Sequence, residues 1–128
     1  MKVAFASSDG KVVDQHFGSS EAFYLWEIGP NTAEFMYRME APSEAGDQED
    51  RITARAAALL GCSIVCTVQI GGPAAAKLVA RQIHPLKIAA DSPIASVVER
   101  LQGVLRGAPP PWLRKAMGPR LPTPVQAI

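Results

Sequence analysis

The sequence has few of the residues from which proteins build permanent metal centres. Its 128 residues include two cysteines (Cys62, Cys66) and two histidines (His16, His84). Their spacing is not that of a zinc finger, and two thiols cannot supply the four thiolates that conventionally hold an iron–sulfur cluster. No run of about 18 apolar residues exists, so we expect no membrane span. Met1–Phe5 lacks the features of a signal peptide, so we expect a cytoplasmic protein with reduced cysteines.

Catalytic motifs are also missing. The chain contains no GxSxG, P-loop, HExxH or CxxC pattern. Three acids (Asp9, Asp14 and Glu21) allow a two-metal hydrolase to be considered, but the expected central strands carry almost no carboxylates to complete such a site. We therefore expect a protein without catalytic activity and rank a hydrolase last.

Charge is unevenly divided along the chain. The net charge is +1, but residues 1–50 carry three basic and ten acidic side chains, whereas residues 51–128 carry ten basic and two acidic ones. A basic second half would attract an anionic ligand. Alternatively, folding mixes the two halves and cancels most of the field. The sequence leaves both alternatives open.

With 48% apolar residues, the chain is long enough for one domain with a hydrophobic core. Apolar runs and alternation predict five strands, at 2–7, 22–28, 34–40, 64–70 and 86–89. Helical spacing predicts helices between Asp50 and Gly61, from Pro73 to His84, and from Pro93 to Gly107, with Asp50 as the first N-cap. This β-β-β-α-β-α-β-α order predicts a mixed α/β sheet flanked by helices.

Two further patterns concern the surface. In the third strand, alternation places Phe35, Tyr37 and Met39 on one face. Residues 108–128 contain six of the eleven prolines, so we expect an extended tail outside the core. The predicted organisation is therefore a ligand-binding α/β domain over 1–107 and a Pro-rich tail over 108–128.

Open α/β sheets bind ligands beyond the carboxyl ends of their parallel strands, and His16 lies in the loop that follows the first strand. Phe17 is expected to anchor this loop by burial and Gly18 to permit an unusual backbone angle. An exposed imidazole here is either a metal ligand or a hydrogen-bonded loop histidine. His84 is expected to cap a helix end, and Cys66 to pack in the core.

The turn at Gly71-Gly72 precedes Pro73 and opens a helix. Its backbone N–H groups and the positive helix end are suited to an anion. Two glycines before a proline are also an ordinary way to begin a helix, so the pattern alone does not decide.

Four segments carry a family resemblance that extends over about residues 1–117. They are Val13-Asp14-Gln15-His16-Phe17-Gly18, Ile70-Gly71-Gly72-Pro73-Ala74-Ala75-Ala76, Ile83-His84-Pro85-Leu86-Lys87 and Pro109-Pro110-Pro111-Trp112-Leu113-Arg114-Lys115. Together they resemble the dinitrogenase iron–molybdenum cofactor biosynthesis family. The proline–tryptophan segment is the most specific of the four, because the wider family often lacks it.

The resemblance implies an RNase H-like fold without nuclease activity and a carrier function. Such proteins bind iron–sulfur precursors of the nitrogenase cofactor, such as the NifB product or a later intermediate, and exchange them with a NifEN-type scaffold. Apo-dinitrogenase is a further candidate partner; nucleic acid and membrane are not expected. By this analogy His16 is a direct iron ligand. The expected cofactor-binding residues are His16, Phe17, Gly18, Gly71, Gly72, His84 and Lys87.

The alternative function is a docking protein for nitrogenase or scaffold subunits, with cluster binding incidental. Trp112, Leu113 and Arg114 are the expected partner-binding residues, because an exposed tryptophan beside extended backbone suits docking. Equally, Trp112 and Leu113 could fold back onto the domain.

Overall fold

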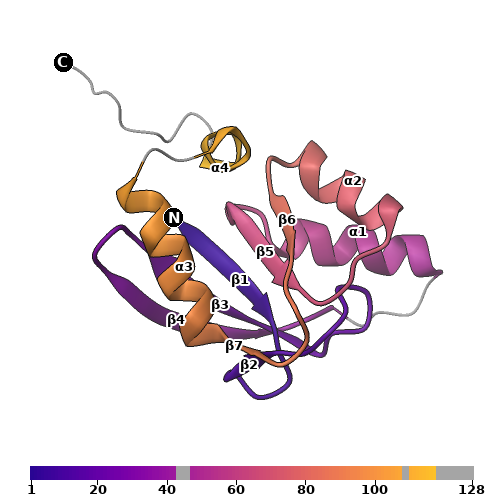
Figure 1. Cartoon of the computed structure of the whole chain (residues 1–128). Helices are drawn as coiled ribbons and strands as arrows, with labels where there is room; N and C mark the ends of the chain where they lie inside the picture. The colour runs from indigo at the N-terminus through magenta and orange to yellow at the C-terminus, as the bar shows by residue number, and fades with distance from the viewer. Residues whose placement is uncertain (43–46, 108–109, 118–128) are drawn as a thin grey trace.

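The computed structural model describes residues 1–42, 47–107 and 110–117 (Figure 1). Its strands are β1 (Lys2–Ala6), β2 (Val12–Val13), β3 (Ala22–Ile28), β4 (Ala33–Glu40), β5 (Ile64–Thr67), β6 (His84–Lys87) and β7 (Ser92–Pro93). Its helices are α1 (Gln48–Ala58), α2 (Gly72–Ala80), α3 (Ile94–Arg106) and α4 (Pro111–Met117). Five strands form a mixed sheet in the order β4-β3-β1-β5-β6, and β2 pairs with β7. The predicted RNase H-like mixed sheet flanked by helices is confirmed.

The sheet is buried on both faces at its centre. Strand β1 is antiparallel to β3 and parallel to β5, which is in turn parallel to β6. Val3 and Phe5 pack toward α3, whereas Ala4 and Ala6 pack toward α1 and α2. Because successive strand residues point to opposite faces, a strand covered on both sides is apolar throughout. Figure 1 shows α3 on one side of the sheet and α1 with α2 on the other.

A β-bulge interrupts the alternation predicted for 34–40. The register between β3 and β4 shifts at Leu25/Trp26, so that Phe35 pairs with Trp26 and Tyr37 pairs with Leu25. Trp26 packs against the α3 core and Leu25 lies in the core beneath α1 and α2. Phe35 and Tyr37 therefore lie on opposite faces, and the prediction of a single face is wrong. An inserted bulge residue reverses the side-chain alternation beyond it.

Two helix and strand boundaries also differ from the prediction. Helix α1 is capped by Asp47, whose carboxylate accepts a hydrogen bond of 2.8 Å from the backbone N–H of Asp50, so Asp50 is not the N-cap. Gly61, with φ of +97°, follows the helix as predicted. Helix α2 ends at Ala80 and His84 begins β6, so the prediction that His84 caps a helix end is wrong.

The segment after Gly107 departs most from expectation. Pro111–Met117 forms α4, which packs against β6, instead of the extended chain that the prolines predicted. Leu113 is fully buried in the core beneath α3, and the Trp112 ring stacks on His84 with centroids 4.6 Å apart. Of the two alternatives for Trp112 and Leu113, folding back is the one observed. Residues 118–128 lie outside the described residues, and the division at 107/108 stays a prediction.

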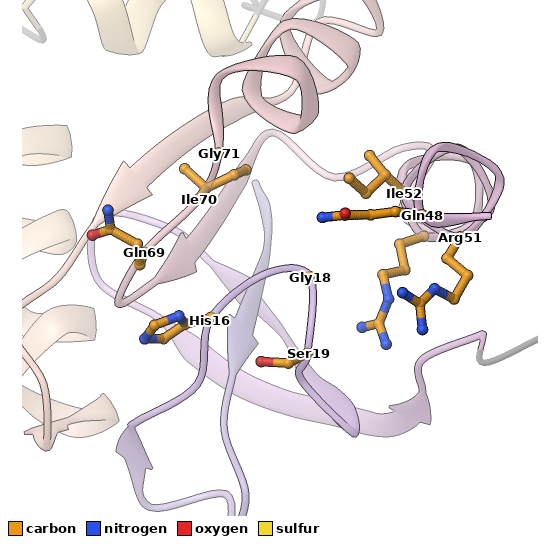
Figure 2. A pocket seen from close by; sticks show the side chains of 10 residues that line it. His16, Gly18, Ser19, Gln48, Arg51, Ile52, Gln69, Ile70 and Gly71 are labelled. Carbon is orange, nitrogen blue, oxygen red and sulfur yellow. The ribbon is translucent and has the colours of Figure 1, made fainter.

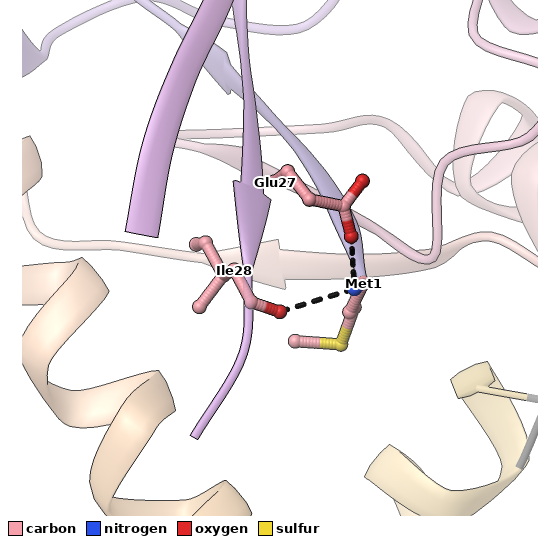
Figure 3. A network of polar contacts seen from close by, with 3 residues as sticks. All are labelled: Met1, Glu27 and Ile28. Atoms are coloured by element: carbon pink, nitrogen blue, oxygen red, sulfur yellow. Dashed lines mark hydrogen bonds and ion pairs between the residues drawn. The ribbon is translucent and has the colours of Figure 1, made fainter. Parts of the chain in front are cut away.

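The start of the chain is tied to the sheet. The Met1 amino group donates hydrogen bonds to the Glu27 carboxylate and, over 3.0 Å, to the carbonyl oxygen of Ile28 (Figure 3). The Ile28 N–H returns a bond of 2.8 Å to the Met1 carbonyl. These bonds extend the pairing of β1 with β3. In the part of the chain described, no helix has the length and apolar character needed to cross a membrane.

Candidate functional site

Short-range hydrogen bonds fix the loop between β1 and β3. The Asp9 carboxylate accepts from the N–H groups of Lys11 at 2.8 Å and Val12 at 3.2 Å, and these bonds lower its pKa. Asp14 accepts from the backbone and side chain of Ser8. Aspartate side chains that accept hydrogen bonds from nearby backbone N–H groups commonly stabilise the shape of a loop. Asp9 and Asp14 are thus engaged in loop structure, and among the residues that the structure describes neither belongs to a cluster of metal-binding side chains.

One close approach makes a glycine necessary in this loop. Gly10 has φ of +79°, and a Cβ built there would lie 2.6 Å from the ring of Tyr24. A side chain at this position would be strained and would collide with β3. The loop therefore lies directly against the sheet.

The backbone around His16 is held by the end of β5. The Phe17 N–H donates to the Gln69 carbonyl at 2.9 Å, and the Val68 N–H donates to the Gln15 carbonyl at 3.0 Å. These bonds make a short parallel bridge between His16 and Gln69. Strand β5 consequently ends at Thr67 and not at residue 70, because the following residues pair with the loop. The imidazole is exposed on a fixed backbone.

Phe17 follows the prediction for its position after His16, whereas Gly18 does not. Phe17 is fully buried, with its ring 5.7 Å from that of Phe23, and anchors the loop as predicted. Gly18 does not have a positive φ, so the predicted unusual backbone angle is wrong. No atom lies within 4 Å of a Cβ built on Gly18. The glycine instead leaves open space in front of the loop.

A pocket of about 630 Å³ lies beside this loop, and we call it the His16 pocket (Figure 2). Its lining comes from the loop after β1, from α1 and from the end of β5 with the turn into α2. The lining residues are His16, Gly18, Ser19, Gln48, Arg51, Ile52, Arg55, Gln69, Ile70 and Gly71. Figure 2 shows His16 on one side and α1 on the other, with Gly18 and Ser19 between them.

Arg51 and Arg55 were missed by the sequence reasoning. Arg55 is only 6% exposed, and its Nη1 donates to the carbonyl oxygens of Ser20 at 2.6 Å and Phe17 at 3.3 Å. It therefore ties α1 to the loop that carries His16. Burial, with a smaller contribution from neighbouring Arg51, lowers the pKa of Arg55. Two arginines four residues apart on a predicted helix were the available signal, because such residues share a helix face.

Gly71 and the start of α2 complete the pocket. Gly71 is the N-cap of α2, and no side chain caps the helix. No side-chain or backbone atom within 4 Å obstructs a Cβ at Gly72, and the nearest atom to one at Gly71 is 4.0 Å away. A ligand can therefore approach the backbone N–H groups at the positive end of the helix. Gly72 opens α2 directly after Gly71.

A second hollow of about 760 Å³ continues from the His16 pocket between α1 and α2. It shares Gly18, Gln48, Ile52 and Gly71 with the first. Alanines of α2 line its floor, and its charged residues are Glu49, Lys77 and Arg81. The His16 pocket thus opens into a longer groove.

The structure does not bring His84 to the His16 pocket. His84 pairs with Ile64 at the amino end of β5, whereas the pocket lies beyond the carboxyl end, at Gln69. It is half-buried under Trp112, and burial lowers its pKa. Lys87 is exposed at the carboxyl end of β6, opposite Thr67, and does not line the pocket.

The residues predicted for partner binding lie elsewhere again. On α4, Leu113 is buried, Trp112 is half-buried and Arg114 is exposed. Only Arg114 presents a largely accessible side chain. A docking surface formed by all three is therefore not present while α4 is packed on the domain.

Neither cysteine is available as a ligand. Cys62 and Cys66 are buried in different halves of the core, and burial raises the pKa of the Cys66 thiol. Within residues 1–42, 47–107 and 110–117, no group of three or more His, Cys, Asp or Glu side chains is arranged to hold a metal ion. Cysteine ligation of metal needs the thiolate, which burial disfavours. His16 is the imidazole exposed at the pocket.

Comparisons with known proteins agree with this fold. A family model described as dinitrogenase iron-molybdenum cofactor matches residues 1–103. The protein NifX of Herbaspirillum seropedicae is 39% identical over 119 residues, covering 91% of this chain and 82% of that protein. The protein NifY of Azotobacter vinelandii is 41% identical over 118 residues, covering 92% of this chain and 48% of that protein.

A solved structure supports the architecture independently. The crystal structure of PH0822 superimposes with a TM-score of 0.60 at 26% sequence identity. The match covers 80% of this chain and 91% of that chain. The layered arrangement of sheet and helices therefore belongs to a fold that is observed experimentally.

Proposed function

Since the chain belongs to the dinitrogenase iron–molybdenum cofactor family, we propose that it carries an iron–sulfur precursor of the nitrogenase cofactor as transient cargo. In this proposal the chain acts in cofactor assembly without catalysing a reaction. It receives the precursor from a NifB-type source and exchanges it with a NifEN-type scaffold, with apo-dinitrogenase as a further candidate recipient. The cargo is the NifB product or a later intermediate.

The observation that carries the proposal is the exposed His16 imidazole on a fixed backbone beside an open pocket. Imidazole nitrogen is a suitable ligand for iron. The hydrogen bonds from Phe17 and Val68 hold the backbone on either side of His16, so the ring is presented without reorganisation of the loop. We assign His16 as the iron ligand.

The lack of thiolates supports a carrier instead of a permanent cluster protein. With Cys62 and Cys66 buried, the chain offers one imidazole where a resident cluster conventionally has four thiolates. A preassembled cluster brings its own sulfides, so a carrier needs few ligands. Weak attachment through one ligand favours release to the next protein.

The other predicted cofactor-binding residues separate into groups. Gly18 and Gly71 leave open space at the pocket for a bulky anionic cargo, and the buried Phe17 anchors the loop that carries Gly18. His84 and Lys87, which we predicted for the same site, are not assigned to it here. The cargo-binding set that the geometry favours is His16, Gly18 and Gly71, with Arg51 and Arg55 added; Gly72 follows Gly71 in the chain but does not line the pocket.

The test is anaerobic incubation of the purified protein with isolated precursor, followed by gel filtration with iron analysis and visible absorption. A carrier elutes with the iron of the cluster, whereas a pure docking protein elutes colourless. We expect His16→Ala to retain iron at least about tenfold more weakly, and His84→Ala, the matched histidine control, to retain it like the parent. Equal retention by all three proteins would remove the ligand assignment and leave the carrier role.

A further inference from the structure

We propose that the His16 pocket contains an oxyanion subsite, formed by Arg51, Arg55 and the amino end of α2, that binds a carboxylate- or phosphate-type group. The role of this subsite in cargo recognition rests on the proposed function. The subsite itself uses no iron and no contact with His16. It can therefore be tested separately.

The first argument is uncompensated positive charge. Arg51 and Arg55 lie one helical turn apart on α1 and both line the pocket, whereas none of its described lining residues is acidic. Among the described residues, the one ion pair joins the Met1 amino group to Glu27, so neither guanidinium has a carboxylate partner there. Two neighbouring cations repel each other, and an anion between them would remove that cost.

The second argument is an unsatisfied donor. Arg55 is more than nine-tenths buried, and while its Nη1 bonds to Phe17 and Ser20, its Nε has no hydrogen-bond partner among the described residues. Leaving a buried donor of a charged group unpaired destabilises the folded state. Native structures seldom leave such groups without a partner. Arg55 also lines the pocket, so its guanidinium places an uncompensated charged group with an unpaired donor at the pocket wall.

The third argument comes from α2, whose amino end lies at the same pocket. Its N-cap, Gly71, lines the pocket and provides no side-chain cap, and its first turn contains no acid. The first N–H groups of a helix need partners and favour anions. The arginines of α1 and the start of α2 at Gly71 therefore face one space from two sides.

The donor chemistry identifies the ligand class. A guanidinium presents planar N–H groups that match the two oxygens of a carboxylate or phosphate. Figure 2 shows that Arg51 projects from the side of the pocket opposite His16. A cargo that meets both would present metal toward His16 and a negatively charged edge toward α1. Such a site selects against neutral or cationic complexes of similar size.

The oxyanion could be part of the cargo or a free cellular anion that the cargo displaces. Inorganic phosphate is the probe for the subsite in either case, because it offers the shared chemistry. Competition then distinguishes the sources. If the negative edge of the cargo occupies the subsite, added phosphate weakens retention of the precursor by the parent protein but not by Arg51→Gln.

The experiment titrates the iron-free, full-length protein with inorganic phosphate at pH 8 and follows the arginine Nε–H signals by NMR. We expect saturable binding that shifts the Arg55 signal. Arg51→Gln should weaken it at least about tenfold. Arg81→Gln is the matched control, because it removes the same charge from the adjacent hollow; its affinity should stay within about twofold of the parent. His16→Ala should also keep phosphate binding.

Each outcome bears on one proposal. Absence of saturable binding, or equal weakening by Arg51→Gln and Arg81→Gln, would overturn the oxyanion subsite, because the attraction would then be non-specific. Phosphate binding without retention of precursor iron would uphold the subsite and overturn the carrier proposal. Iron retention that depends on His16, without phosphate binding, would uphold the carrier proposal and overturn the oxyanion subsite.

Discussion

The two histidines of the chain lie at opposite ends of the parallel strands and have different surroundings. His16 follows β1, pairs through its backbone with Gln69 beyond the carboxyl end of β5, and exposes its ring beside a pocket. His84 begins β6 opposite the amino end of β5, and Trp112 covers its ring. The first is fixed through its backbone and open at its side chain, while the second is covered. This difference suits ligand binding at one end and packing at the other.

The cover over His84 depends on a leucine of α4. Because the Leu113 side chain is fully buried, Leu113→Ala should lower the free energy of unfolding by about 2–5 kcal/mol, measured by denaturant titration. Leu60→Ala removes a mostly exposed leucine and should change it by less than about 0.5 kcal/mol. A Leu113→Ala protein as stable as the parent would mean that α4 is not part of the core.

The fixed backbone at His16 depends on Arg55. Arg55→Met removes the hydrogen bonds to Phe17 and Ser20 while keeping an apolar stem, so we expect a loss of stability of about 1–3 kcal/mol. Amide hydrogen exchange should accelerate in residues 16–20 and not around His84. Uniform acceleration across the sheet would instead assign Arg55 a general structural role. Arg55→Lys keeps the charge and should show a smaller effect.

The Trp112 ring accounts for the environment of His84. Trp112→Ala exposes the imidazole to water and should raise its pKa toward the ordinary value of 6.5, because burial is the cause of its lowered pKa. NMR titration of the ring protons measures this directly. A His84 titration unchanged by the substitution would show that the stack does not shield the ring.

The smallest expected effect is a pH dependence of the free energy of unfolding that arises from the covered His84. The folded pKa of His84 lies below 6.5, so the unfolded chain takes up a proton first as the pH falls. The contribution of the neutral His84 to the free energy of unfolding is therefore complete above pH 6.5. It is lost as the pH falls from there through the folded pKa. The midpoint temperature of thermal unfolding should therefore fall between about pH 8 and pH 5, and His84→Gln should reduce this fall. An identical decline in both proteins would assign it to other groups.

Local patterns in the sequence predicted the His16 end of the parallel strands well. Strand β1, the burial of Phe17, the exposure of His16 and the helix start after Gly71 follow from apolar runs, glycines and proline, which act over a few residues. The mixed sheet followed from the order of the elements. Each of these features depends on contacts that are short in sequence or on general rules of chain connection.

Contacts between distant segments were not predictable in the same way. Arg55 reaches the carbonyl of Ser20, 35 residues away, only because α1 packs beside that loop. The bulge that separates Phe35 from Tyr37 leaves no mark on the alternation itself. Prolines predicted an extended tail, but a proline is also tolerated in the first turn of a helix, and the burial of Leu113 decided the outcome.

The burial of both cysteines has a practical consequence for chemical labelling. Thiol-directed reagents attack an accessible thiolate, and the native fold presents none at Cys62 or Cys66. A cysteine introduced at Ser19, on the pocket wall, would be the single reactive thiol of the folded chain. A fluorophore or spin label attached there would report arrival and departure of cargo without the native cysteines first being removed.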